Sequence, residues 1–475
     1  MIYENVMPNP PDIIEQPTGD MNEQNTNLKW KKEYKNLAYV LFSPSGNYNK
    51  MLSKIVTLIS VVIAVTITTG VVVAIMYWIR SYSRHHHDHD HGGNVTTLEC
   101  VFYPFETSPH PLFVLSGTSS LLFPTWPEKV VRISKGQKVD FICPGKTILI
   151  GKIHLSTDIL VGTCFSGSKF QIDDDLVEWA DLRCNDSNWR DIRNTGNTCA
   201  RDGKELETGF AVSDGRFIRT LTICFNSAMQ IAYYTYINQT SAISERKLDN
   251  VRPIFLQGNV SYTIGNVTNL YKRGNQRTTV NRLLNLPDNS ERYIQNNSDF
   301  FLARGHMTAR SDGYYAAQQN ATFYMQNIAP QWQKFNARNW NQIEIDVRDY
   351  AAKNGVDLQV WTGVYGVTTL PNNKTGEPTE LYLFVNGTSK YLPVPEIFWK
   401  VAYEPISERG VALIGVNNPY NDTFNKLCVD VSNKLSWLHC DRNNQELGFC
   451  YACSITNLRR VVTYIPHVNE KGLLL

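Results

Sequence analysis

Residues that could together cleave a phosphodiester bond occur between positions 304 and 348. They are Arg304, His306, Asn336, Glu344 and Arg348. A histidine can take a proton from water, and an amide oxygen such as that of Asn336 suits a divalent cation that keeps most of its water ligands. Guanidinium groups hold phosphate oxygens with paired hydrogen bonds. This combination predicts a metal-assisted hydrolytic site, because phosphodiester hydrolysis needs all three functions.

The spacing of these residues predicts the elements that carry them. Asn336, Trp340, Glu344 and Arg348 are four residues apart, so on a helix they lie along one slowly drifting face. On this face Trp340 would be the residue that packs in the core, and Glu344 would hold a metal-bound water. Arg348 would reach the phosphate together with Arg304. The helix is expected to end near residues 354–355, a plausible C-cap. Strands are expected at 300–302, delivering the arginine and histidine, and at 321–326.

The ordered motifs resemble those of the DNA/RNA non-specific endonucleases of the ββα-metal fold, a family that includes secreted insect nucleases and endonuclease G. The family pattern reads Asp-Arg-Gly-His, then Asn-x-x-Pro-Gln, then Asn-x-x-x-Trp-x-x-x-Glu-x-x-x-Arg. The chain follows it at 304–306, at 327–331 and at the four helical positions. The resemblance implies His306 as general base, Asn336 as ligand of Mg²⁺ (or Mn²⁺), a 5′-phosphate product and a homodimer.

One position departs from the family pattern. Ala303 stands where the family has its leading Asp, so any hydrogen bond made by that carboxylate must come from another residue. A nuclease fold that has lost catalysis and only binds or takes up nucleic acid is therefore the alternative function, and an adhesive glycoprotein is a third. A further family arginine lies upstream of the histidine motif, and Arg252 is its best match here.

Composition limits how a nucleic acid could be bound. The chain has 475 residues, 42% of them hydrophobic, which allows a large core and two or three structural units. The net charge is only +2, so a polyanion would have to be held by a local basic patch. The candidate substrate-binding patch is Lys272, Arg273 and Arg277; an ordinary solvated loop is the alternative. Contacts mainly to the backbone of DNA and RNA predict little sequence preference.

If His306 has the ordinary imidazole pKa of about 6.5, its role as a base predicts a lower pH limit for activity. The imidazole would be largely protonated in an acidic endosome and could not act as a base. The expectation is therefore that activity falls below that pH.

A charge-free run rich in Val, Ile and Thr, residues 55–79, predicts a transmembrane signal anchor. Residues 1–54 form a polar tail that is expected to be disordered in the cytoplasm, and 80–97 a His-rich stalk. All ten cysteines follow the anchor, as do all ten glycosylation sequons. This asymmetry predicts a single-pass type II membrane glycoprotein whose C-terminal part is extracellular or luminal. The sequons are at Asn94, Asn185, Asn238, Asn259, Asn266, Asn296, Asn320, Asn373, Asn386 and Asn421.

Two units are expected after the stalk. Residues 98–205 contain short Val- and Ile-rich runs and five cysteines, which predicts a β-rich, disulfide-containing leader module. Residues 206–475 would form the endonuclease domain, an α+β fold with a mixed sheet. The four C-terminal cysteines Cys428, Cys440, Cys450 and Cys453 favour two disulfides over a zinc site, because thiols in an oxidising compartment tend to be paired.

Overall fold

The computed structural model describes residues 99–475 apart from 106–108, 187–189 and 247–251. The chain divides into two compact units, 1–94 and 95–475, and the second contains all described residues. The predicted tail, membrane anchor and stalk therefore lie outside the part that the structure describes. Within the described part, no helix has the length and hydrophobicity that a membrane span requires.

The leader module consists of short strands, as the sequence predicts. Its main sheet has five strands in the order β2-β4-β7-β8-β9, while β1 pairs with β3 and β5 pairs with both β6 and β10. Two disulfides, Cys100–Cys164 and Cys143–Cys184, lie within this module. The strands are β1 Glu99–Phe102, β2 Leu112–Leu115, β3 Val131–Ser134, β4 Lys138–Ile142, β5 Ile148–Ile150, β6 Ile153–His154, β7 Ile159–Ser166, β8 Lys169–Ile172, β9 Asp175–Glu178 and β10 Leu182–Cys184.

A nine-stranded sheet forms the frame of the C-terminal region. Its order is β11-β12-β13-β14-β17-β22-β23-β24, and β25 pairs with β23 in parallel while the other neighbours are antiparallel. The predicted α+β architecture with a mixed sheet is thus observed, but the sheet begins before the predicted boundary at residue 206. The strands are β11 Asp191–Thr198, β12 Lys204–Ala211, β13 Phe217–Asn226, β14 Ile231–Gln239, β17 Leu358–Tyr365, β22 Ile397–Glu404, β23 Arg409–Val416, β24 Cys450–Cys453 and β25 Gly472–Leu473.

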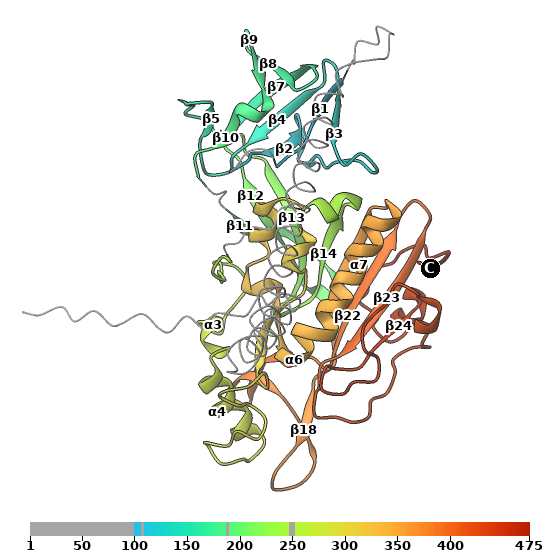
Figure 1. Ribbon diagram of the computed structural model, residues 1–475. Coiled ribbons are helices and arrows are strands. Elements are labelled where there is room, and N and C mark those ends of the chain that lie inside the picture. Colours follow the sequence, from blue (N-terminus) through green and yellow to red (C-terminus); the bar gives the residue numbers. More distant parts are fainter. Residues whose placement is uncertain (1–98, 106–108, 187–189, 247–251) are drawn as a thin grey trace, which may run out of the picture. The chain divides into compact units, whose positions relative to one another are not determined.

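The central strand β22 is buried on both faces. Phe398 packs against Trp340, with ring centroids 5.4 Å apart, and so faces the start of helix α7 (Asn341–Asn354), which lies across the sheet in Figure 1. Trp399 packs on the other face against Tyr464, at 6.3 Å. Successive side chains of a strand point to opposite faces, which places Lys400 on the same buried face as Phe398. A lysine therefore lies inside the apolar layer beneath the helix.

A hairpin followed by a helix carries the motif residues. Strand β15 (Leu302–His306) pairs with β16 (Ile328–Trp332), so that His306 lies opposite Ile328. The chain continues through α6 (Gln333–Phe335), a π-helical turn (Asn336–Trp340) and α7 (Asn341–Asn354). The predicted helix and its C-cap are confirmed, since Gly355 has the left-handed φ of 66°. Two strands and a helix follow the order that the resemblance implies; the metal-binding form of this fold stays a prediction.

The strand predicted at 321–326 is wrong. This stretch contains the end of α5 (Ala316–Ala321) and the start of a short 3-10 turn, Met325–Asn327. Its amide side chains are buried and hydrogen-bonded to loop carbonyls: Gln326 Nε2 donates to Gln257 O at 2.6 Å and Asn327 Nδ2 to Thr322 O at 2.9 Å. The second strand of the hairpin starts only at Ile328. The first strand also lies later than predicted, at 302–306 instead of 300–302.

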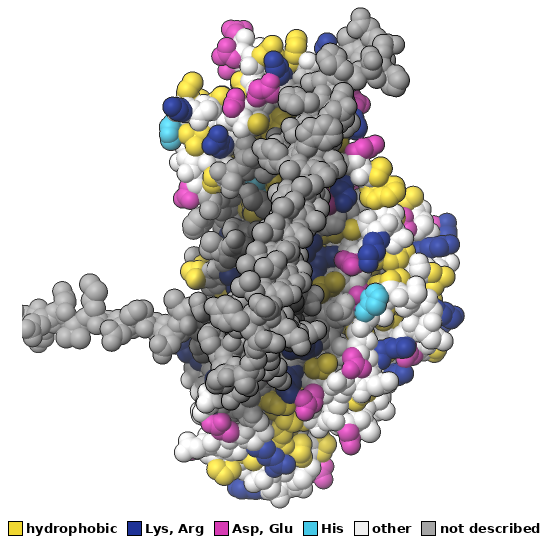
Figure 2. Space-filling view, in the orientation of Figure 1, with side chains coloured by type: hydrophobic (Ala, Val, Ile, Leu, Met, Phe, Trp, Pro, Cys, Tyr) yellow, Lys and Arg dark blue, Asp and Glu magenta, His cyan; other side chains and the backbone are white. Residues whose placement is uncertain are grey.

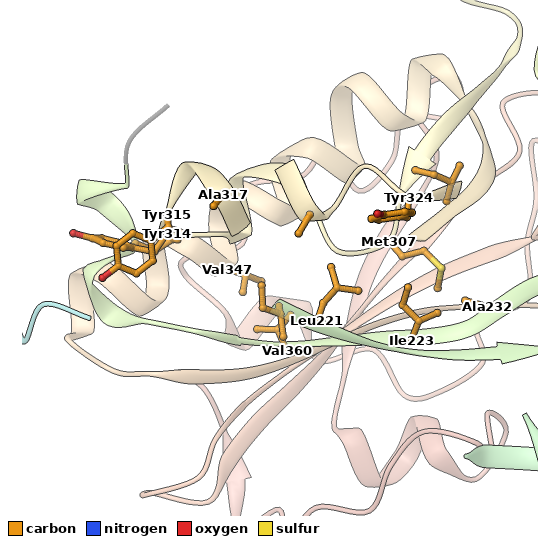
Figure 3. Packing of buried hydrophobic residues seen from close by; sticks show 14 of the residues in the cluster. Leu221, Ile223, Ala232, Met307, Tyr314, Tyr315, Ala317, Tyr324, Val347 and Val360 are labelled. Atoms are coloured by element: carbon orange, nitrogen blue, oxygen red, sulfur yellow. The ribbon is translucent and has the colours of Figure 1, made fainter. Parts of the chain in front are cut away.

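Apolar residues next to the motif positions anchor them in the core. Figure 3 shows Met307, directly after His306, pointing toward Ile223 and Ala232 of the sheet. The same view shows Val347, directly before Arg348, against Val360. Met307 and Val347 are almost completely buried. The hairpin end and the helix are therefore fixed by packing on one sheet.

Smaller elements complete the region. Helix α8 (Ile455–Arg459) packs on β23, and α3 (Val267–Leu270) contacts α4 (Arg273–Leu283), which contacts β20. The strands β18 (Thr369–Pro371), β19 (Pro378–Glu380), β20 (Tyr382–Asn386) and β21 (Ser389–Pro393) form two hairpins. The C-terminal cysteines form Cys428–Cys453 and Cys440–Cys450, which confirms two disulfides and excludes the zinc alternative. Cys199–Cys224 is the fifth bridge, and no cysteine is left free in the described part, which contains all ten.

Candidate active site

His306 lies between two phenylalanine rings at the end of β15. Its ring centroid is 5.2 Å from that of Phe255 and 4.8 Å from that of Phe323. The Nε2 atom is buried and has no hydrogen-bond partner among the described residues. Burial, and then the nearby Arg252, lower the pKa of His306 to about 3. The low pKa favours a neutral imidazole over the physiological range, in contrast to the ordinary pKa of about 6.5 expected from the sequence, and the pH dependence of activity stays a prediction.

The turn after His306 is closed by the asparagine of the second motif. Thr308 N donates to Asn327 Oδ1 at 2.9 Å, and Asn327 Nδ2 donates to Thr308 O at 2.9 Å. Glycine is required at position 305 for steric reasons, because a Cβ there would lie 2.5 Å from Gln331 Cβ on the paired strand. Both motifs thus shape the hairpin that presents the histidine.

Two arginines share the aromatic surroundings of His306. The guanidinium of Arg304 lies 4.8 Å from the ring centroid of Phe255, and that of Arg252 lies 5.5 Å from the centroid of Phe323. Within the described residues neither arginine has a carboxylate partner. Burial, and then the positive charge of Arg304, lower the pKa of Arg252. The structure thus brings the predicted residues Arg252, Arg304 and His306 together, and a bound anion would relieve the repulsion between the two guanidinium groups.

A third arginine near this group was not predicted from the sequence. The charge of Arg310 acts on both Arg252 and His306, lowering the pKa of each, so it lies within electrostatic range of both. It begins the short 3-10 turn Arg310–Asp312. Its place four residues after the histidine was the available signal.

Arg348 is held by a buried carboxylate. Its Nη1 lies 2.8 Å from Asp312 Oδ1, and the second carboxylate oxygen lies 3.6 Å from Lys400 Nζ. Lys400 also donates to Thr362 Oγ1 at 2.7 Å. The side chains of Arg348, Asp312 and Lys400 are only 6%, 2% and 1% exposed. The guanidinium of Arg348 is thus enclosed and paired, and its predicted phosphate contact stays a prediction.

Glu344 belongs to the same buried charge network, one turn of α7 before Arg348. Burial raises the pKa of Glu344 to about 7; Asp312 adds to this rise, whereas Lys400 and Arg348 oppose it. The negative charge of Asp312 also acts on His306. It raises the pKa of the histidine, but the opposite effect of burial is larger. Asp312 is therefore the carboxylate that links the histidine loop with the helix. Neither Asp312 nor Lys400 was predicted from the sequence.

Ala303 leaves no carboxylate at the family's leading position, and it lies opposite Gln331 in the hairpin. Asp312, nine residues later in the sequence, receives a hydrogen bond from Ala309 N at 3.2 Å, which ties its carboxylate to the loop that follows His306. A negative charge is thus supplied to the histidine loop from another position.

Asn336 is the first residue of the π-helical turn. Its Nδ2 lies 3.3 Å from Gln333 Oε1, which orients the amide and leaves Oδ1 for another ligand. A neutral amide oxygen fits a hard divalent cation that keeps most of its waters. No group of three His, Cys, Asp or Glu side chains that could form an all-protein metal cage occurs in the described part of the chain. The donor chemistry at Asn336 thus suits a mostly hydrated ion.

The path of the chain relates Asn336 to the histidine. The hairpin register places Trp332, four residues before Asn336, opposite Leu302, at the far end of the strand from His306. The helix then returns along the hairpin, because Arg348 contacts Asp312 in the loop after His306. No hydrogen bond or ion pair between described residues joins Asn336 to His306. Their convergence around one cation stays a prediction.

The candidate basic patch lies at the start of helix α4, so the alternative of an ordinary solvated loop is not observed. Lys272 precedes α4 and is exposed. Arg273 donates to Gln295 O at 3.0 Å and lies 3.9 Å from the ring centroid of Phe301, and Arg277 donates to Ile294 O at 3.0 Å. These two arginines hold a loop, and their contact with the substrate stays a prediction. On the face drawn in Figure 2, the described Lys and Arg side chains are interspersed with Asp and Glu.

The match to a family model agrees with this geometry. A model described as DNA/RNA non-specific endonuclease matches residues 202–455, more than half of the chain. The chain belongs to this family and is a nuclease, a hydrolase of phosphodiester bonds. Members of the family are generally metal-dependent.

Two relatives extend the likeness beyond the family model. The chain is 28% identical to a salivary endonuclease of Lutzomyia longipalpis over 364 residues, which cover 75% of this chain and 81% of the relative. It is 22% identical to salivary protein Tsal2A of Glossina morsitans morsitans over 370 residues, covering 76% and 90%. Both alignments are too long to start at residue 202, so they include part of the leader module. A chain from the crystal structure of the EndoG/EndoGI complex is 18% identical, with a TM-score of 0.34, and covers 54% of this chain and 88% of that one.

Proposed function

We propose that this chain is a Mg²⁺-dependent endonuclease that cleaves DNA, RNA or both with little sequence preference. The observation that carries the proposal is the group of Arg252, Arg304 and His306, in which two arginines without a carboxylate partner among the described residues flank a neutral, desolvated imidazole. Such a group suits a phosphodiester: the guanidinium groups bind its oxygens and the imidazole accepts a proton.

Each residue has a distinct task in the proposed reaction. His306 takes the proton from the attacking water, while Arg304 and Arg252 hold the scissile phosphate. Asn336 would hold the metal directly and Glu344 would hold one of its waters. Bound Mg²⁺, or Mn²⁺, would stabilise the charge that develops on the departing 3′-oxygen. The product ends are then a 5′-phosphate and a 3′-hydroxyl.

Low specificity follows from the kind of contact. Guanidinium groups on phosphate oxygens fix the position of a strand and read no bases. Both DNA and RNA carry such phosphates, so either polymer could serve as the substrate.

We further propose that residues 55–79 anchor the chain in a membrane, with the C-terminal part outside the cell or in a lumen, where it degrades foreign nucleic acid. Five disulfides support an oxidising compartment, since such bonds are rare in the cytosol. The dimer implied by the family resemblance stays a prediction.

The test is cleavage by the full-length chain in detergent. Plasmid DNA, single-stranded RNA and double-stranded RNA are incubated with Mg²⁺, with Mn²⁺ or with a chelator. We expect cleavage with metal, and a loss of about 10²–10⁴-fold in His306→Ala with nucleic-acid binding retained. His154→Ala, an exposed histidine on β6, is the control and should keep full activity. Binding without cleavage by the wild type would favour the inactive binding protein.

A further inference from the structure

One large apolar side chain is exposed at the edge of the candidate site. Ile254 is 76% exposed, although hydrogen bonds fix the backbone at its own carbonyl and two residues after it. Arg190 Nη2 donates to Ile254 O at 2.9 Å, and Tyr324 OH in turn donates to Arg190 O at 3.0 Å. Two residues later, Leu256 N donates to Phe323 O at 3.0 Å. The exposed side chain is therefore presented by a pinned segment.

The neighbours of Ile254 in the sequence are parts of the site. Phe255 contacts the His306 ring, and Arg252 stacks on Phe323. Exposure alternates along the segment: Arg252 and Ile254 leave a larger fraction of their surface accessible than Pro253 and Phe255 do, although the guanidinium of Arg252 is partly desolvated. In an extended segment residues i and i+2 point to the same side and are about 6.6 Å apart. A strand whose phosphate meets Arg252 would thus bring its sugar or base to Ile254.

Exposure by itself would not single out this residue, because isolated surface isoleucines are common. Ile406 is even more exposed, at 92%, in the turn between β22 and β23. Ile254 is distinguished by its place two residues after Arg252, which together with Arg304 could bind a phosphate. Apolar side chains in that position on nucleic-acid-binding proteins press between neighbouring bases and partly unstack them.

We infer that Ile254 acts as a wedge at the base step beside the scissile phosphate and biases the cleavage of duplex DNA toward steps that unstack easily. The inference rests on the proposed function. Pyrimidine–purine steps such as TA are the most deformable, whereas A-tracts are stiff. A wedge reads this deformability without hydrogen bonds to base edges, so it adds a step preference to a site whose other contacts are to the backbone.

The test compares cleavage at single steps. End-labelled duplexes that are identical except for a central TA or AA step are cut by the full-length chain with Mg²⁺ under single-turnover conditions. The wild type should cut the TA step roughly ten times faster than the AA step, because the deformable TA step admits the contact of the Ile254 side chain with the bases and the stiff AA step does not. Ile254→Ala should reduce that ratio to about two or less, whereas Ile406→Ala should leave it unchanged.

The outcomes separate the two proposals. Equal wild-type rates at the two steps, or an unchanged ratio in Ile254→Ala, would overturn the wedge alone. Absence of any cleavage by the wild type would overturn the proposed function and the wedge with it. A ratio lowered equally by Ile254→Ala and Ile406→Ala would also contradict the inference, because it would point to a general effect of surface truncation.

Discussion

Two groups of cations in this molecule differ in what neutralises them. Arg252 and Arg304 lie on aromatic rings beside His306, and no described carboxylate pairs with either. Arg348 and Lys400 are deeper in the fold, and both contact the carboxylate of Asp312. The first group suits an incoming phosphate, whereas the second joins the histidine loop to α7 and β22. The partner of a cation, more than its place in a motif, decides which role it has.

The largest expected effect is the loss of stability when the second group of cations loses its carboxylate. Asp312→Asn keeps the volume but removes the carboxylate that pairs with two buried cations, which costs about 3–5 kcal/mol of unfolding free energy. Urea unfolding of the full chain near neutral pH would measure it. Asp349→Asn is the matched control, since its partner Lys353 is exposed, and should change stability by less than about 0.5 kcal/mol. An equal, small loss in both variants would contradict the buried role of Asp312.

The sign of the pH effect on this carboxylate follows from its pKa. Burial alone would raise the pKa of Asp312, but Lys400 and Arg348 outweigh burial and lower it. Its contribution to stability is therefore complete above the unfolded pKa of about 3.9 and is lost as the pH falls through the lower folded value. Asp312→Asn should remove that part of the acid-induced loss.

The next effect concerns the pH dependence of cleavage. Burial raises the pKa of Glu344 to about 7, so below that pH the group is increasingly protonated and cannot hold a metal-bound water as a carboxylate. The kcat/KM value should fall about tenfold per pH unit below the pKa, whereas His306, with its pKa lowered to about 3, should add no limb in this range.

Glu344→Gln distinguishes these two groups. The variant should be less active but should lose the acidic limb, because its amide does not titrate. If the limb survives in this variant, another group titrates there, and the depressed pKa of the histidine would be in doubt.

A smaller effect is expected when a structural arginine in α4 is compared with the exposed lysine directly before that helix. Arg277→Ala removes a hydrogen bond from a charged donor to Ile294 O, which should cost about 1.5–3 kcal/mol of stability while the affinity for DNA stays nearly unchanged. Lys272→Ala, at the exposed start of the helix, should do the reverse, with a stability change below about 0.5 kcal/mol and slightly weaker binding at low salt. Thermal unfolding and filter binding would compare them. Weaker DNA binding by folded Arg277→Ala would restore its predicted substrate contact.

The sequence predicts much of the scaffold because the signals are local. The helix ending at Gly355, the strands of the leader and the two C-terminal disulfides all follow from spacing and composition. The strand β16 was placed too early because Pro330 and Gln331 interrupt its apolar pattern, while the preceding stretch owes its burial to amides that bond loop carbonyls. Phe335, directly before the π-helical turn, packs close to Gly415 and Gly448 from distant parts of the chain, a contact that the local sequence does not reveal.

The candidate site was only partly predictable for a related reason. The positions of His306 and the helical residues follow from local motifs. The pairing of Asp312 with Lys400 joins residues that are 88 positions apart, and only the folded sheet brings them together. A lysine within the apolar run of β22 was the one local sign that a buried carboxylate must exist, because a buried cation needs a partner. That pairing also explains why Arg348 could not be assigned from its type alone.

The salt dependence of DNA binding tests the central contrast most directly. The full-length chain is titrated with a short duplex in a chelator at several salt concentrations, comparing the wild type, Arg304→Ala and Arg348→Gln under conditions in which each is folded. Each phosphate contact contributes about 0.9 to the slope of log K against log salt. The slope should become shallower by about that amount in Arg304→Ala and stay at the wild-type value in Arg348→Gln. A wild-type slope in Arg304→Ala together with a shallower one in Arg348→Gln would contradict the assignment of the two groups.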